Sequence, residues 1–149
     1  MGVLRGSLYL IRKVVIRMIY RKNIDVNARD TFLITDIQAS TIASKVIGIV
    51  PVKCELISVK EVHGTAAGQT GTIGIERLQG TEVSGAGDNV VAVNGINLQG
   101  TADTVQSGTI VKTSNIHQFA AGDRVGVELA NNSATCATMI VACQFRPID

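Results

Sequence analysis

The sequence predicts an all-β protein: an antiparallel β-sandwich or jelly roll of about eight strands, with an N-terminal arm outside the sandwich. Apolar residues make up 46% of the 149 residues but aromatic residues only 3%, so Val, Ile, Leu and Ala must supply the core. β-Branched and small side chains suit pleated strands better than a helical bundle. After residue 30, strand-sized apolar segments follow one another with turn-forming residues between them. The length is that of one domain with a core of its own.

Eight segments have the length and composition of strands. The clearest alternation is in "DRVGVELA", where apolar side chains alternate with polar or small ones from Arg124 to Ala130. In "KVIGIVPVKCEL", Pro51 interrupts an apolar run and predicts an edge, a bulge or a crossing between sheets. We expect the strands at Thr31–Ile37, Lys45–Val50, Cys54–His63, Thr72–Leu78, Asn89–Leu98, Thr104–Lys112, Arg124–Ala130 and Thr135–Phe145. Together with the lack of helical periodicity, they indicate packed layers of strands over residues 31–149.

The last of these segments is apolar on both faces. In "ATMIVACQF", one face carries Met139, Val141, Cys143 and Phe145, and the other carries Ile140 and Ala142. Such a strand is covered on both sides, by a second sheet or by neighbouring subunits. We therefore predict a subunit interface that includes Met139, Ile140, Val141 and Phe145.

Residues 1–30 form a predicted arm that is basic and amphipathic. Apolar residues recur at steps of three or four from Leu4 to Ile19, which is helical periodicity. Residues 1–22 contain six Lys or Arg and no acid, while the remaining eight Lys and Arg face twelve Asp and Glu. The arm is thus a cationic segment on a mildly acidic body. Its predicted contact residues are Leu4, Arg5, Leu8, Ile11, Arg12, Lys13, Val15, Arg17, Arg21 and Lys22.

Three interpretations of the arm remain: a segment that docks on a partner protein, a helix on a membrane surface, or a translated extension upstream of an original start at Met18. Charges interrupt the apolar run, which excludes a membrane-spanning helix and fits a signal peptide poorly. The segment 14–16 consists of strand formers, so an extended arm is also open. Aliphatic residues between the cations favour a protein surface over nucleic acid.

A pattern of Gly-Thr followed by small residues occurs three times, beginning at Gly64, Gly80 and Gly100. The spacings differ, which excludes a repeat solenoid. Each copy follows a predicted strand, so we interpret the pattern as turn chemistry. Glycine there permits positive φ, and threonine bonds to the turn backbone.

The sequence contains no recognisable catalytic, cofactor or metal motif. His63 and His117 are the only histidines, and we expect both on the surface or in loops. The acids are spread over separate strands and loops, so no carboxylate pair is indicated. Cys54, Cys136 and Cys143 lie in apolar segments without metal-like spacing, which predicts reduced core thiols. An enzyme would need His63, His117 and an acid to meet in space.

The stretch from Cys54 to Phe145 resembles a family of small bacteriophage virion proteins, the head decoration, cement or fibre proteins. The resemblance lies in "CELISVKEVHGTAAGQTGTIGIERLQGTE", "GINLQGTADTVQSGTI" and "FAAGDRVGVEL". It implies a jelly roll similar to the tumour-necrosis-factor-like trimers, with an N-terminal segment reaching the capsid shell. The basic start of this chain is not part of the resemblance.

We therefore predict a non-enzymatic homotrimer that binds the major capsid protein on the exterior of a phage head and is made in the bacterial cytoplasm. No cofactor, metal or membrane is expected, and nucleic acid is disfavoured. The alternative is a fibre or spike tip of the same fold that binds a glycan or receptor. Glycan binders usually expose aromatic residues, and both Tyr9 and Tyr20 lie in the arm.

Overall fold

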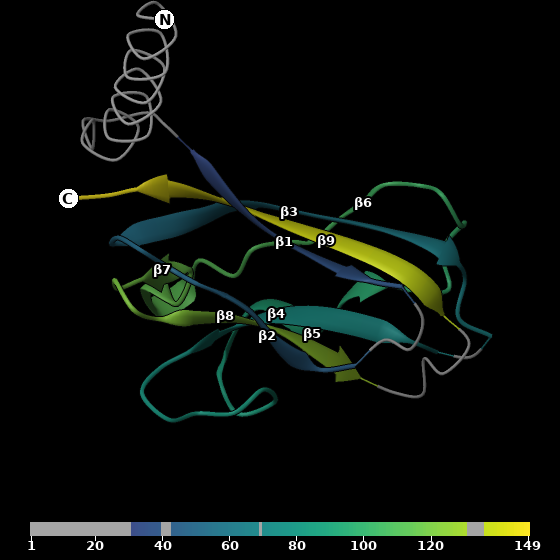
Figure 1. The fold of residues 1–149 in the computed structure, drawn as a ribbon, viewed down its shortest axis with the longest axis horizontal. Helices are drawn as coiled ribbons and strands as arrows, with labels where there is room; N and C mark the ends of the chain where they lie inside the picture. Colours follow the sequence, from purple (N-terminus) through teal and green to yellow (C-terminus); the bar gives the residue numbers. More distant parts are fainter. Residues whose placement is uncertain (1–30, 40–42, 69, 131–135) are drawn as a thin grey trace, which may run out of the picture. The chain divides into compact units, whose positions relative to one another are not determined.

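The predicted all-β sandwich is confirmed. The computed structural model describes residues 31–39, 43–68, 70–130 and 136–149. Their strands form two antiparallel sheets that face each other (Figure 1). Thr31–Asp149 is one compact unit. The predicted arm over residues 1–30, with all of its predicted contact residues, lies outside the described residues.

Sheet A has five strands and sheet B has four. In sheet A the order is β1-β9-β3-β6, with β7 also paired to β3; in sheet B it is β2-β8-β4-β5. The bounds in sheet A are β1 Phe32–Gln38, β9 Ala137–Pro147, β3 Cys54–Thr65, β6 Gln106–Ser107 and β7 Gln118–Phe119. Those in sheet B are β2 Lys45–Ile49, β8 Arg124–Ala130, β4 Thr72–Leu78 and β5 Asp88–Asn97.

Most connections cross from one sheet to the other, which closes the sandwich around a single core. Pro51 lies in the short segment that leaves β2 in sheet B and enters β3 in sheet A. The sequence predicted an edge, a bulge or a crossing between sheets at Pro51, and the structure shows the crossing. A proline there costs no ladder hydrogen bond, because the segment belongs to neither sheet.

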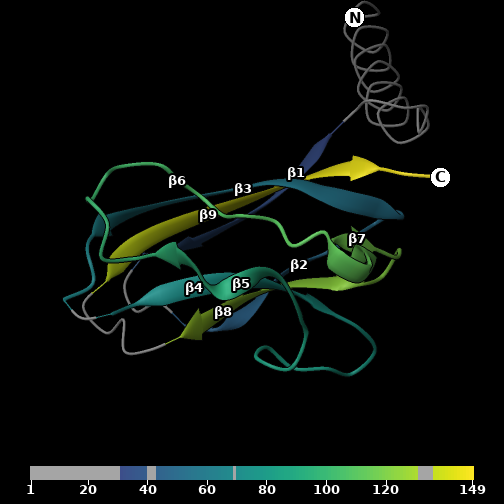
Figure 2. The same cartoon turned by 180° about the vertical axis from the view of Figure 1, so that it is seen from behind.

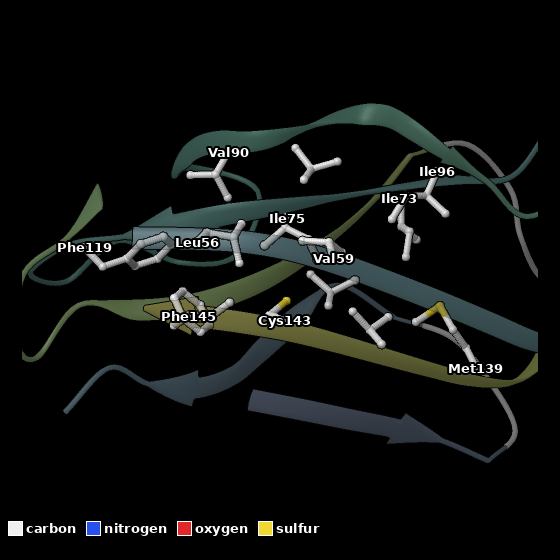
Figure 3. Close-up of a cluster of buried hydrophobic side chains, with 14 of the residues drawn as sticks. Leu56, Val59, Ile73, Ile75, Val90, Ile96, Phe119, Met139, Cys143 and Phe145 are labelled. Atoms are coloured by element: carbon white, nitrogen blue, oxygen red, sulfur yellow. The ribbon is translucent and has the colours of Figure 1, made fainter. Parts of the chain in front are cut away.

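The core lies between the sheets and is built mainly of aliphatic side chains (Figure 3). Its aromatic part is a cluster of three rings. Phe145 stacks on Phe32 with ring centroids 5.3 Å apart and meets the edge of Phe119 at 5.2 Å. These three rings are the large aromatic side chains in a core that otherwise consists of smaller, mainly aliphatic side chains.

The side chains of β9 alternate between two faces as expected, and one face is buried while the other is partly exposed. Met139, Val141 and Phe145 are fully buried inside the chain's own sandwich, whereas Ile140 is 38% exposed on the outer face of sheet A. The three buried side chains cannot reach a subunit surface without opening the sandwich. The interface prediction is therefore kept for Ile140 alone.

The predicted strand Thr104–Lys112 is largely wrong. Only Gln106–Ser107 forms strand β6, and Ile110 makes one isolated bridge to Val91. The segment instead runs along one side of the sandwich and bonds to both sheets (Figure 2): Gly108 N–H donates to the Val59 carbonyl, and Val111 N–H to the Val90 carbonyl. Its β-branched composition suits a strand, but its position between the sheets prevents continuous pairing.

Replacing Phe145 by alanine should lower the free energy of unfolding by about 3–5 kcal/mol, because a buried ring is lost and a cavity remains between Phe32 and Phe119. Urea denaturation measures this loss. Val83→Ala is the matched control, since Val83 is 69% exposed and its truncation should change little. A cost below about 1 kcal/mol for Phe145→Ala would contradict this description of the core.

Candidate functional site

A buried pair of ionisable side chains, Glu61 and His63, lies on the core-facing side of β3. Both are fully shielded from solvent. The His63 Nδ1 atom is 3.0 Å from Glu61 Oε1, and its Nε2 atom is 3.1 Å from the Gly100 carbonyl oxygen. The prediction that His63 is a surface or loop residue is wrong.

The geometry of this pair determines where its protons are. A carbonyl can only accept, so Nε2–H donates to Gly100. Burial is the main cause that raises the pKa of Glu61, against the opposing effect of its bond to His63. A protonated Glu61 donates to Nδ1, and an ionised Glu61 accepts from it, so the pair can hold its contact with one shared proton.

Two further contacts join the pair to the segment 97–106. Gln106 Nε2 donates to Glu61 Oε2 at 3.1 Å and to the Asn97 carbonyl at 2.7 Å. The Asp103 amide donates to the His63 carbonyl at 2.8 Å. One side-chain atom of each residue, together with the His63 carbonyl, thus holds the segment 97–106, which contains the repeated Gly-Thr at Gly100. This cluster is structural.

Alternation along β3 does not predict the burial of this pair, because a β-bulge reverses the alternation before Glu61. Counting alternate residues from Leu56 would place Glu61 and His63 on the outer face of β3. The register with β9 shifts between Leu56 and Ser58, which moves all later residues to the opposite face. Without knowledge of the bulge, the two side chains appear solvent-facing.

A second buried carboxylate, Glu76, lies on the outer face of sheet B beneath the loop between β4 and β5. Its oxygens accept hydrogen bonds from the Ser84 hydroxyl at 2.6 Å and from the amides of Gly85 and Gly87 at 2.9 and 3.2 Å. The loop extends from sheet B on the side away from sheet A (Figure 1). Glu76 therefore fixes the loop 79–87 over this face.

Space for that carboxylate comes from Gly126, which is opposite Glu76 in β8. A Cβ atom on Gly126 would lie 2.6 Å from Glu76 Oε1, too close for any relaxed contact. Two loop glycines have other roles: Gly80 and Gly85 have positive φ, as the turn interpretation of the Gly-Thr pattern expects at Gly80.

His117 is at the opposite end of β3 from His63. Its Nε2 atom is 3.6 Å from Glu55 Oε2, and Arg146 binds the other oxygen of the same carboxylate. His117 is buried, but it lies in the turn before β7, so the prediction of a surface or loop position holds for it as a loop residue. The backbone of Leu56 bonds to His117, seven residues before His63, a separation of roughly 20 Å along a strand. The two histidines do not meet, and a shared catalytic centre is excluded.

The three cysteines lie among the described residues and are buried. Burial raises the pKa of Cys54 and Cys143 to about 12 and that of Cys136 to about 11, so these thiols stay protonated at neutral pH. All three are free, as expected. No three His, Cys, Asp or Glu side chains of the described part are grouped to hold a metal ion. That part also has no helix with the length and apolar character to span a bilayer.

No family model and no curated protein sequence matches this chain. Two solved structures contain a similar chain. Both are bacteriophage capsids. A chain of the capsid of Ralstonia phage GP4 matches with a TM-score of 0.54 and 16% identity, over 83% of this chain and 86% of that one. A chain of the cyanophage Pam1 capsid asymmetric unit matches with a TM-score of 0.47 and 13% identity, over 80% and 84%. The GP4 likeness shows a shared fold over more than four-fifths of each chain.

Replacing Gly126 by alanine should destabilise the protein by about 1–3 kcal/mol and loosen the loop 79–87, because the added methyl displaces the Glu76 carboxylate. Denaturant unfolding and hydrogen exchange over the loop measure the two effects. Gly64→Ala is the matched control, since a methyl there makes only ordinary contacts with Thr138. Equal stability of the two variants would contradict a close contact at Gly126.

The variant Glu61→Gln should reveal the raised pKa of Glu61 through the pH dependence of stability. The folded protein binds the Glu61 proton more tightly than the unfolded chain, whose pKa is near 4.5. This contribution is therefore fully present below that pH and is lost as pH rises above it. The unfolding free energy of the wild type, relative to the variant, should fall accordingly in urea titrations at successive pH values. The same substitution at the exposed Glu82 is the control, and a difference that stays constant with pH would refute the prediction.

Proposed function

We propose that this protein is a non-enzymatic structural component of a bacteriophage virion that binds the outside of the capsid as a trimer and stabilises it. The observation that carries the proposal is the fold shared with a chain of the GP4 capsid over more than four-fifths of both chains. A match of that extent cannot be confined to one hairpin.

The use of the polar groups supports a structural role. Glu61, His63 and Glu76 are buried, and their hydrogen bonds go to the chain's own loops. Groups saturated in this way have no free atom for a substrate. What they stabilise is the shape of the domain, which is what a capsid component must keep.

The arm supplies the proposed contact with the major capsid protein. Its aliphatic residues would pack on the shell while the six cations of residues 1–22 meet carboxylates around them. A trimer carries three such arms. After one arm dissociates, the others hold it near its site, so the complex lasts far longer than a single-arm contact.

The alternative, a fibre tip that binds a glycan, finds less support. A sugar-binding surface usually has exposed aromatic rings. The described residues contain three aromatic side chains, all phenylalanines: Phe119 and Phe145 are fully buried, and Phe32 packs against the core. The described body therefore offers no ring for stacking on a sugar.

Deleting residues 1–22 should abolish binding to the capsid while leaving the sandwich folded, because the deletion ends before β1. Binding is measured by co-sedimentation with heads that were assembled without this protein. The full-length triple variant Arg12→Gln, Lys13→Gln, Arg17→Gln should weaken binding, most clearly at low salt.

The control neutralises two exposed cations of the body, Lys53 and Lys112, in the same way. It should bind heads like the wild type. Undiminished occupancy of heads by the chain without residues 1–22 would show that the arm is not the anchor. Loss of binding in the control and not in the arm variant would place the contact on the body.

A further inference from the structure

The two outer faces of the sandwich differ in what covers them. On sheet B, the loop 79–87 folds over part of the face and is held there by the buried Glu76. At the other edge of this sheet, Val46 and Ile49 of β2 are 39% and 65% exposed. On sheet A, large aliphatic side chains are open to solvent: Leu33 is 63% exposed, Ile37 66% and Ile140 38%. Exposed side chains of this size, grouped on one face, usually mark a contact surface.

The strand register brings these side chains together. Ile140 of β9 lies between Ile37 of β1 and Val62 of β3, so the three form one row across sheet A. Leu33 stands two rows away on the same face of β1, beside Gln144. Cross-strand neighbours on one face are in direct contact, so Ile37, Ile140 and Val62 form a continuous apolar row. The row of Thr35, Ala142 and Lys60 separates Leu33 from it. We refer to this surface as the sheet A face.

The charges around the sheet A face leave it nearly neutral. Between Leu33 and Ile37 on β1, and between Ile140 and Gln144 on β9, the outward side chains are uncharged. Lys60 of β3 is the one charged side chain on the middle row, and it bonds to the Ser107 hydroxyl. A nucleic acid or a strongly acidic surface would find a single cation there, and a basic partner would find no carboxylate in these rows.

The edge of sheet A adds to this surface. β1 is the end strand of its sheet and pairs only with β9, so its other edge has no strand partner among the described residues. Edge strands are usually protected by charges, proline or a covering segment. The single acid of β1, Asp36, is paired with Lys45 at 2.8 Å and adds no net charge to the edge.

We propose that the sheet A face, together with the free edge of β1, binds a second copy of this chain. A neutral apolar surface does not repel its own copy, and the central parts of interfaces between identical subunits are apolar and poor in charge. The proposal deepens the proposed function, because it names the surface through which the copies of the trimer meet.

The variant Ile37→Asp tests the proposal in the full chain. A carboxylate in the middle of the interface should raise the dissociation constant between copies at least about 30-fold, as measured by light scattering over a dilution series. Val83→Asp is the matched control: Val83 is 69% exposed but lies in the loop over sheet B, so this variant should keep the native mass. Circular dichroism and melting confirm that each variant is folded.

Milder variants keep the test decisive if Ile37→Asp fails to fold. Ile37→Thr and Ile140→Thr retain β-branched strand formers and should each weaken association by about tenfold. Hydrogen exchange of the peptide 31–38 should also be slower at high protein concentration than at low concentration, which Val83→Asp should not change.

The other outcomes overturn the proposal. They are a wild-type chain that is monomeric at all concentrations, an Ile37→Asp oligomer as tight as the wild type, or a chain that becomes monomeric when residues 1–22 are removed. Head binding is measured separately. Monomeric Ile37→Asp that binds heads more weakly than the wild type would support both the face as the copy interface and the trimer of the proposed function. An oligomer that binds no heads would reject the proposed function alone.

Discussion

The pairing of β9 with β1 on one side and β3 on the other is the interaction on which the rest of the structure depends. It places Phe145 between Phe32 and Phe119, so that all three phenylalanines of the chain meet at one point in the core. Because successive side chains of a strand point to opposite faces, the same pairing that buries Phe145 presents Ile140 to the outside. Core and proposed copy interface are thus two faces of one strand. The strands it joins are far apart in sequence, so sheet A forms by long-range closure, a slow step in folding.

A core with few aromatic side chains offers little apolar surface for long loops to pack against. In this protein, two buried acidic side chains hold the loops by hydrogen bonds. Glu76 accepts three hydrogen bonds from the loop 79–87, and Glu61, with His63, holds the segment 97–106. A buried carboxylate is costly unless its oxygens are bonded, and both meet that condition. The side chains of Glu61, His63 and Glu76 therefore hold loops in place.

Sequence patterns predicted the sandwich well where strands obey simple alternation, as in Arg124–Ala130 and in β9. They failed where the environment outweighs local preference. The segment Thr104–Lys112 has a strand-like composition, but it bonds alternately to the two sheets and pairs continuously with neither. The burial of Glu61 could not be predicted, because the bulge that turns it inward leaves no mark in residue types. Glu76 was missed for another reason: its cover is a loop whose path depends on Gly126 in a distant strand.

The sequence by itself determined most of the segments that are strands and that β9 is apolar on both sides, since both follow from the local order of side chains along an extended chain. Only the tertiary structure decided which side is inside. It placed Met139, Val141 and Phe145 in the chain's own core and left Ile140 and Ile37 at the surface. The physical reason is register: a shift of one residue between strands exchanges the two faces, and register is set by pairing between strands far apart in the sequence.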